Sequence, residues 1–287
     1  KISKNFCEII GVGLNGFKYK KDLTLNAGNS GTLGRLILGL LVHSKKGIKI
    51  KGDESLSKRD FLRVIKPLEE FGAKFNSTNG KLPIKIHGTN NSKPIRFYEN
   101  KGSAQCKSAV MFAALNTFGE TIIKAKKSRD HSELLFKHLK LPIKIYKKNH
   151  YDIIKIFGKH KIPALNYKIP SDISSAAFFI VLTALVKNSS LKIRNVNINP
   201  SRMGIFYILK LMGVNITKIN IRNYKGEKIA DLLIKSTNNI KPINCPIKLN
   251  SSAIDEFLLI FLVAAKAKGI SYFKNLSELN QKESPRL

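Results

Sequence analysis

Serine and arginine stand close together at four places in the chain, and both residue types suit the binding of small anions. The pairs are Ser57 with Arg59, Ser128 with Arg129, Ser201 with Arg202, and Ser284 with Arg286, and their serines are 71, 73 and 83 residues apart. A guanidinium group is planar, permanently charged and able to donate two parallel hydrogen bonds to a phosphate or carboxylate. A surface arginine that pairs with a neighbouring acid would look the same, so the pattern alone leaves both interpretations open.

Two further features could carry chemistry. Asp255 lies at the start of an otherwise apolar stretch, and apolar surroundings tend to raise the pKa of a carboxyl group into the range of general acid–base catalysis. The alternative is a helix-capping acid that complements the helix dipole. The run Asn29-Ser-Gly-Thr32 opens an apolar helix whose first N–H groups could face an anion. Its alternative is an ordinary cap in which Gly31 serves only the turn.

The elements that must position these residues repeat along the chain. Each repeat has a small or polar start, an apolar helix, a small-residue turn and a strand, and the Ser/Arg element follows the strand. The helices are expected at 29–41, 103–115, 171–185 and 253–265, and the strands at 47–51, 121–124, 191–194 and 270–273. In the first three repeats a second, amphipathic helix follows, and Gly72 and Gly213 stand where helix C-caps belong. We therefore predict about three and a half α/β units, with the first helix of each unit buried on all sides.

Length and charge limit the class of protein. A chain of 287 residues suggests about two domains, each large enough to bury a core. The net charge of +32 raises the possibility of a nucleic-acid-binding protein. Only nine of the 51 basic residues are arginine, however, and the lysines are spread along the whole chain. This distribution favours the attraction of small anions over nucleic-acid binding.

Other classes of protein and of site are disfavoured. The longest uncharged run, 173–186, is shorter than the ~20 residues that a membrane span needs. The three cysteines, Cys7, Cys106 and Cys245, are odd in number and far apart, which excludes a disulfide scaffold and a cysteine zinc site and fits a reducing cytosol. His131 and Glu133 imitate part of a deaminase zinc motif, but no matching cysteine pair follows. We expect a monomeric cytoplasmic protein without metal, cofactor, membrane or nucleic-acid partner.

Nine motifs, taken in order along the chain, resemble the enolpyruvyl transferase family. They are Cys7-Glu-Ile-Ile-Gly11, Gly28-Asn-Ser-Gly-Thr-Leu-Gly-Arg35, Gly52-Asp-Glu-Ser-Leu-Ser-Lys-Arg59, Ser103-Ala-Gln-Cys-Lys-Ser108, Ser128-Arg-Asp-His131, Ser171-Asp-Ile-Ser-Ser-Ala-Ala177, Asn199-Pro-Ser-Arg-Met-Gly204, Ile254-Asp-Glu256 and Lys282-Glu-Ser-Pro-Arg286. The resemblance implies an α/β (α+β) fold of two domains built from βαβαββ units, with the active site in the cleft between them. It places most of one domain in 1–169 and part of the second in 170–287. It also implies a fragment, inactive as it stands, that lacks an upstream Pro-Gly-Ser/Asp-Lys motif and a downstream Asp-His-Arg motif.

The family branch that the motifs match best acts on shikimate 3-phosphate, on the route to chorismate and the aromatic amino acids. The implied reaction moves the enolpyruvyl group of phosphoenolpyruvate to the 5-hydroxyl of shikimate 3-phosphate and releases phosphate, through a tetrahedral ketal and without a metal. The resemblance assigns phosphoenolpyruvate binding to Gly31, Arg59, Gln105 and Arg286. It assigns shikimate 3-phosphate binding to Ser103, Ala104, Gln105, Ser128, Arg129, Asp255 and Lys282. It gives the catalytic proton transfers to Asp255 and Glu283.

Some positions depart from the family pattern, and alternatives stay open. Ala104 replaces a serine, so only its backbone could contribute, and Pro285 replaces an acid. Asp172 and Arg202 mirror site positions in another repeat, and we interpret them as structural or hinge residues. The branch that uses UDP-N-acetylglucosamine is the first alternative, but Glu54 stands where most of its members carry a reactive cysteine. A basic nucleic-acid-binding repeat protein and a non-catalytic scaffold are the others. The resemblance further implies inhibition by glyphosate, which Gly31 leaves room to bind.

Overall fold

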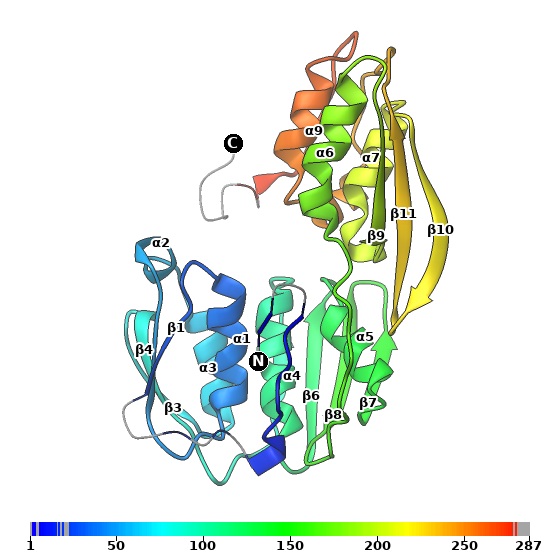
Figure 1. Cartoon of the computed structure of the whole chain (residues 1–287). Helices are drawn as coiled ribbons and strands as arrows, with labels where there is room; N and C mark the ends of the chain where they lie inside the picture. Colours follow the sequence, from blue (N-terminus) through cyan, green and yellow to red (C-terminus); the bar gives the residue numbers. More distant parts are fainter. Residues whose placement is uncertain are drawn as a thin grey trace. The chain divides into compact units, whose positions relative to one another are not determined.

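The chain divides into two units, and each is described here by itself. A computed structural model describes residues 2–3, 6–15, 17, 19, 23–277 and 279. Unit 1 comprises residues 1–128 and 136–166, and unit 2 comprises residues 129–135 and 167–287 (Figure 1). The segment 129–135 therefore belongs to unit 2, although the residues on both sides of it belong to unit 1. No helix in the described part of the chain is long and apolar enough to cross a bilayer.

Unit 1 opens with a complete βαβαββ repeat, preceded by the short helix η1 (Gly13–Asn15). Its elements are β1 (Leu23–Asn26), α1 (Gly31–Leu41), β2 (Ile48–Lys51), α2 (Glu54–Ser57), α3 (Leu62–Glu70), β3 (Lys74–Thr78) and β4 (Lys81–His87). The strands form one sheet in the order β1-β2-β4-β3. The pair β1–β2 is parallel, and the other two pairs are antiparallel.

The second repeat has the same topology. It contains β5 (Arg96–Glu99), α4 (Ala104–Leu115), β6 (Glu120–Lys126), α5 (His131–His138), β7 (Ile143–Lys147) and β8 (Tyr151–Phe157). The sheet order is β5-β6-β8-β7, again with one parallel and two antiparallel pairs. The repeated α/β plan that the sequence predicts is confirmed for these two repeats.

Unit 2 carries a third repeat and the start of a fourth. The third consists of α6 (Ile173–Leu185), β9 (Ser190–Asn197), η2 (Pro200–Arg202), α7 (Gly204–Leu211), β10 (Ile216–Tyr224) and β11 (Glu227–Lys235), with an antiparallel sheet in the order β10-β11-β9. A single parallel bridge between Ser171 and Val196 takes the place of the first strand. The start of the fourth contains η3 (Ile247–Leu249), α8 (Asn250–Ala253) and α9 (Phe257–Ala264).

The strand predicted at 270–273 is wrong, because only Tyr272 makes a bridge there, with Asn244. Its partner segment is flanked by Pro242 and Pro246. Proline has no N–H to donate, so a ladder cannot extend past either residue.

Local signals in the sequence explain where the helices begin and end. Side-chain oxygens of Ser30, Ser103 and Asp172 cap α1, α4 and α6 by accepting a backbone N–H of the first turn. After α3 and α7, Gly72 and Gly213 have φ angles of 102° and 83°, as the predicted C-caps require. Eight described residues other than glycine also have positive φ, and all are asparagine or lysine: Asn79, Lys140, Lys159, Asn188, Asn195, Asn220, Lys225 and Asn275.

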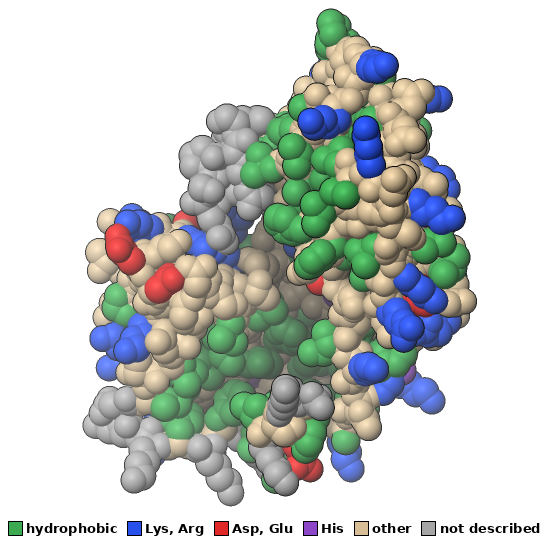
Figure 2. Space-filling view, turned by 45° about the horizontal axis from the view of Figure 1, so that its top comes forward, with side chains coloured by type: hydrophobic (Ala, Val, Ile, Leu, Met, Phe, Trp, Pro, Cys, Tyr) green, Lys and Arg blue, Asp and Glu red, His purple; other side chains and the backbone are tan. Residues whose placement is uncertain are grey.

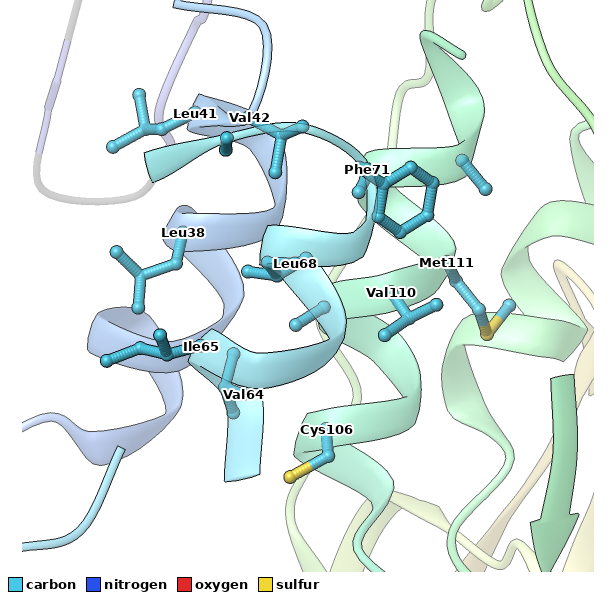
Figure 3. Close-up of a cluster of buried hydrophobic side chains, with 14 of the residues drawn as sticks. Leu38, Leu41, Val42, Val64, Ile65, Leu68, Phe71, Cys106, Val110 and Met111 are labelled. Carbon is cyan, nitrogen blue, oxygen red and sulfur yellow. The ribbon is translucent and has the colours of Figure 1, made fainter. Parts of the chain in front are cut away.

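Each unit has its own hydrophobic core. In unit 1 the buried faces of α1, α3 and α4 meet, with Leu38, Leu68 and Val110 fully buried (Figure 3). α1 and α4 approach so closely that a Cβ on Gly39 would lie 2.1 Å from the carbonyl oxygen of Ala109. In unit 2 the core forms between α6, α7, α9 and the sheet, around Ile180, Phe206 and Phe257.

The prediction that the first helix of every repeat is buried on all sides holds for α4 but is wrong for α1, whose Leu33 is 50% exposed, and for α6 and α9 of unit 2. In α6, Phe178 is 64% and Leu182 59% exposed, and in α9 Leu258 is 51% and Leu262 49% exposed. One face of each of these helices packs in the core of unit 2, while no described residue covers the opposite face. Figure 2 shows hydrophobic side chains gathered on the visible surface of this unit.

His43 makes the stability of unit 1 depend on pH. Its Nε2 lies 3.0 Å from Ser92 Oγ and 3.2 Å from Thr117 Oγ1. Burial, helped by the charge of Lys159, lowers the pKa of His43 from 6.5 to about 4.

Between these two values the unfolded chain binds a proton that the folded chain does not, so the free energy of unfolding falls as the pH drops from 6.5 towards 4. Because the ring is partly exposed, we expect His43 to contribute about 2 kcal/mol to this loss. Urea denaturation at pH 7 and pH 4.5 should show that His43→Gln loses less stability over this range than the wild-type protein does. Equal losses in both would contradict the assignment.

Candidate active site

The first part of the site is the start of α1 in unit 1. Ser30 caps the helix by accepting the N–H of Leu33 at 3.1 Å, and the first-turn N–H groups of an α-helix have no acceptor within the helix. Two contacts bind this turn to the neighbouring loop: the N–H of Asp53 donates to the carbonyl of Gly28 at 2.9 Å, and Asn29 Nδ2 donates to Asp53 Oδ2 at 2.5 Å. The hydrogen bonds from Asn29 and the Leu56 N–H lower the pKa of Asp53. These links fix the loop that leads to Arg59.

Two guanidinium groups converge on Gly31. A Cβ at this glycine would lie 2.8 Å from Nη1 of Arg59 and 3.0 Å from Nη1 of Arg35. Burial and the charge of Arg63 lower the pKa of Arg35, and the charge of Arg59 adds to the effect. Like charges this close repel each other in a partly buried setting. An anion between them would remove that repulsion.

Gln105, at the start of α4, joins this cluster through two side-chain hydrogen bonds. Its Oε1 accepts from Arg35 Nη1 at 2.8 Å, and its Nε2 donates to Thr32 Oγ1 at 2.9 Å. Arg35 also donates from Nη2 to the carbonyl of Asp60 at 3.3 Å, and its guanidinium carbon lies 5.1 Å from the centre of the Phe61 ring. The predicted residues Gly31, Arg59 and Gln105 are therefore brought together, and Arg35 connects them.

A buried carboxylate holds the loop that leads into α4. Glu99 is 5% exposed and accepts the N–H of Lys101 at 3.1 Å and that of Ser103 at 2.9 Å. Ser103 in turn caps α4 by accepting the N–H of Cys106 at 3.3 Å, and Ala104 follows as the first helical residue. Ser103 and Ala104 thus lie in the same turn as Gln105. Ser128, the last residue of unit 1 before the segment 129–135 of unit 2, has a buried Oγ with no hydrogen-bond partner among the described residues.

In unit 2 two predicted site residues form an ion pair. Arg129 donates from Nη2 to Oδ2 of Asp255, a residue 126 positions away in the chain. The side chains are 34% and 26% exposed, respectively. Asp255 lies in the turn before α9, near the predicted start of an apolar helix. Its carboxylate meets a cation there, whereas the sequence predicts apolar surroundings for it.

The residues that follow Arg129 are anchored to the sheet of unit 2. Asn199 Nδ2 donates to Asp130 Oδ1 at 2.9 Å and to Glu227 Oε1 at 3.0 Å. The Nδ1 of His131 lies 2.6 Å from the same Glu227 oxygen, and Asn197 donates to the other oxygen at 2.6 Å. Although burial opposes the effect, the hydrogen bonds from His131, Asn199 and Asn197 lower the pKa of Glu227. This network fixes the backbone on which Arg129 stands.

Glu256, the residue after Asp255, is held in place by a hydrogen bond from α6. Glu256 is 2% exposed, and burial raises its pKa. It accepts a hydrogen bond from Ser174 Oγ, which itself accepts from Arg202 Nη2. Arg202 also pairs with the α6 cap residue Asp172 at 3.1 Å. Arg202 and Asp172 therefore support the turn that carries Asp255, in keeping with the structural role predicted for them.

Not every predicted site residue can be placed, and some contributing residues were missed. Lys282, Glu283 and Arg286 lie outside the described residues. Arg35, Glu99 and Glu256 were not predicted; the arginine in the motif Gly28–Arg35 and the acid beside Asp255 were signals that could have found two of them. Within the described ranges, no group of three or more histidine, cysteine, aspartate or glutamate residues could hold a metal ion.

The fold defines the class of protein. The enolpyruvyl transferase NikO from Streptomyces tendae has a similar structure, with a TM-score of 0.58 over 82% of this chain and 54% of that chain. At 12% sequence identity this likeness shows the fold alone. The predicted α/β fold of repeated units is thus confirmed, and the chain shares this fold with that enolpyruvyl transferase.

The chain belongs to the EPSP synthase (3-phosphoshikimate 1-carboxyvinyltransferase) family, whose model matches residues 1–287. The 3-phosphoshikimate 1-carboxyvinyltransferase of Ruthia magnifica is 44% identical over 97% of this chain and 63% of its own length. An EPSP synthase structure from Acinetobacter baumannii has a TM-score of 0.84 and 38% identity, covering 96% of this chain and 62% of that chain. The chain spans about two thirds of the length of these relatives.

Proposed function

We propose that the protein transfers the enolpyruvyl group of phosphoenolpyruvate to the 5-hydroxyl of shikimate 3-phosphate and releases phosphate. Family membership over the whole chain and the names of the relatives support this assignment. The observation that carries it is the convergence of Arg35 and Arg59 on Gly31, with Gln105 hydrogen-bonded to the same cluster. Such a cluster suits a compact anion that carries both a carboxylate and a phosphate.

The family resemblance suggests how the residues divide between the two substrates. In the proposal, Arg59 and the turn at Gly31 hold phosphoenolpyruvate, together with Arg286. Ser103, Ala104, Ser128, Arg129 and Lys282 hold the phosphate of shikimate 3-phosphate, and Gln105 contacts both substrates. Asp255 takes the proton of the attacking 5-hydroxyl, and Glu283 serves the methylene carbon of the enolpyruvyl group. The oxygen attacks C2, C3 gains a proton, and the ketal then loses phosphate and that proton.

The assignment is tested by phosphate release from phosphoenolpyruvate, catalysed by the product of the complete reading frame that encodes this chain. Shikimate 3-phosphate and UDP-N-acetylglucosamine are offered as acceptors in separate reactions. We expect turnover with shikimate 3-phosphate alone. Turnover with only the nucleotide sugar, or with neither acceptor, would contradict the proposal.

The alternatives have less support. Glu54, at the position of the cysteine typical of the UDP-N-acetylglucosamine branch, is exposed and pairs with Lys58 at 2.6 Å. The nucleic-acid alternative rests only on the net charge of +32. We further propose that the protein works as a monomer in the cytoplasm, and the three free cysteines fit a reducing compartment.

Replacing Gly31 by alanine is expected to make the enzyme resistant to glyphosate. The new methyl group would project between Nη1 of Arg59 and Nη1 of Arg35, into space that the proposal gives to the donor or to glyphosate. We expect the inhibitor concentration for half-maximal inhibition to rise by about tenfold or more, equivalent to about 1.4 kcal/mol of lost binding.

The matched control is Gly11→Ala, because a Cβ at Gly11 would meet no atom of the described residues within 4 Å. Inhibition curves of the wild-type enzyme and of both variants give the comparison. Equal inhibition of the wild type and Gly31→Ala would show that the space at Gly31 does not limit inhibitor binding.

A further inference from the structure

Two residues that the proposed function assigns to the same substrate form an ion pair with each other in the structure. Arg129 donates to the carboxylate of Asp255, and both belong to unit 2. If the proposed function holds, this carboxylate must be available to a hydroxyl and this guanidinium to a phosphate. We infer that the ion pair is the resting state of the acceptor site. The phosphate of the acceptor replaces Asp255 on Arg129, and this exchange frees the carboxylate to take the proton of the 5-hydroxyl.

Anchoring on both sides makes the resting pair well defined. The backbone next to Arg129 is held by Asp130 and His131 through Asn199 and Glu227. Glu256, the neighbour of Asp255, is held through Ser174 on α6. Because neither partner relies on a freely moving segment, forming the pair costs little conformational entropy.

The exposure of the pair allows the exchange. About a third of the Arg129 side chain is exposed, so an incoming phosphate can reach the side chain before the carboxylate leaves. A phosphate dianion carries more charge than a carboxylate and can accept two parallel hydrogen bonds from the guanidinium fork. An ion pair that is about a third exposed contributes little to stability, so a phosphate can readily take the place of the carboxylate.

The exchange would link catalysis to the correct acceptor. While Asp255 Oδ2 accepts from Arg129, that oxygen is not available to a hydroxyl group. Water and unphosphorylated acceptors carry no group that can displace the carboxylate. In the inference, the base is thus released by a phosphate that reaches Arg129, the position that the proposed function gives to the acceptor and not to phosphoenolpyruvate.

The test compares two ligands, shikimate 3-phosphate and shikimate, which share the 5-hydroxyl and differ in the phosphate. Isothermal titration calorimetry on the product of the complete reading frame gives the ratio of their affinities. Asp255→Asn removes the internal competitor for Arg129, so we expect the ratio to rise about fivefold over wild type. Asp255 can also contact the 5-hydroxyl, which both ligands carry. Any affinity lost with that contact is therefore shared by both ligands and cancels in the ratio.

Three further variants make the result specific. In Asp255→Asn with Arg129→Gln, the ratio should equal that of Arg129→Gln alone. Glu120→Gln breaks a similarly exposed pair of a carboxylate and a cation outside the site, with Lys155, and should leave the ratio unchanged. Asp255→Ser removes the same carboxylate and replaces Asp255→Asn if that variant does not fold.

Each outcome has a distinct meaning. A ratio that stays constant or falls in Asp255→Asn, or that still rises without Arg129, overturns the exchange and leaves the proposed function intact. Wild-type protein that binds neither ligand and releases no phosphate overturns the proposed function, and the inference with it.

Discussion

Asp255→Asn is expected to lose turnover by about 10²- to 10⁴-fold while its affinity for phosphoenolpyruvate stays nearly unchanged. Asparagine keeps the size and the hydrogen-bonding capacity of the side chain but cannot take a proton from the 5-hydroxyl. In the structure its carboxylate contacts Arg129, and the proposed function gives it no contact with phosphoenolpyruvate. The loss should therefore appear in kcat rather than in the KM for phosphoenolpyruvate.

Steady-state phosphate release with both substrates varied measures the two constants separately. Glu120→Gln is the matched control, since it also neutralises a carboxylate paired with a cation, Lys155, and is predicted to keep activity within about threefold of wild type. If Asp255→Asn retained more than a tenth of the wild-type kcat, Asp255 would not be the general base.

The second large effect concerns the packing of α1 against α4. A methyl group on Gly39 would meet the carbonyl oxygen of Ala109 at 2.1 Å and its carbonyl carbon at 2.9 Å. Both are backbone atoms within a buried helix, so the clash can be relieved only by separating the two helices. We expect Gly39→Ala to lower the free energy of unfolding by about 3 kcal/mol or more.

Gly34→Ala provides the control in the same helix. Its Cβ would lie 3.3 Å from Cε1 of Phe61, a side-chain contact that can adjust by a few tenths of an ångström. Replacing glycine by alanine within a helix gains about 0.5–1 kcal/mol, which offsets this adjustment. Urea denaturation of the three proteins should place Gly34→Ala near the wild type. Similar midpoints for Gly34→Ala and Gly39→Ala would contradict the close approach.

The repeated architecture could be predicted from the sequence because its signals are local. Ser30, Ser103 and Asp172 precede apolar runs and cap the helices that follow, and Gly72 and Gly213 end helices with positive φ. Where a segment depends on a distant partner, the prediction fails. The strand at 270–273 needed an extended partner, and the prolines around Asn244 restrict that pairing to one bridge.

The site was predictable in its members and less so in its contacts. The motifs identify Gly31, Arg59 and Gln105, and the structure brings these three together. Arg35 was missed because its position within an apolar helix does not reveal that it reaches Gln105, 70 residues away in the sequence. The pairing of Arg129 with Asp255 depends on long-range folding, which residue spacing cannot encode.

The turn residues with positive φ offer a way to raise the stability of this protein. Three of the eight are lysines, Lys140, Lys159 and Lys225, whose Cβ atoms make this backbone conformation unfavourable by about 1 kcal/mol or more. In the turns after α3 and α7, which correspond to the turn of Lys140 after α5, the chain has glycine, where no such penalty arises. A composition so rich in lysine has thus placed small energetic defects at turns that the proposed chemistry does not use. Correcting them with glycine offers a route to a more robust protein that leaves the arginine cluster and Asp255 untouched.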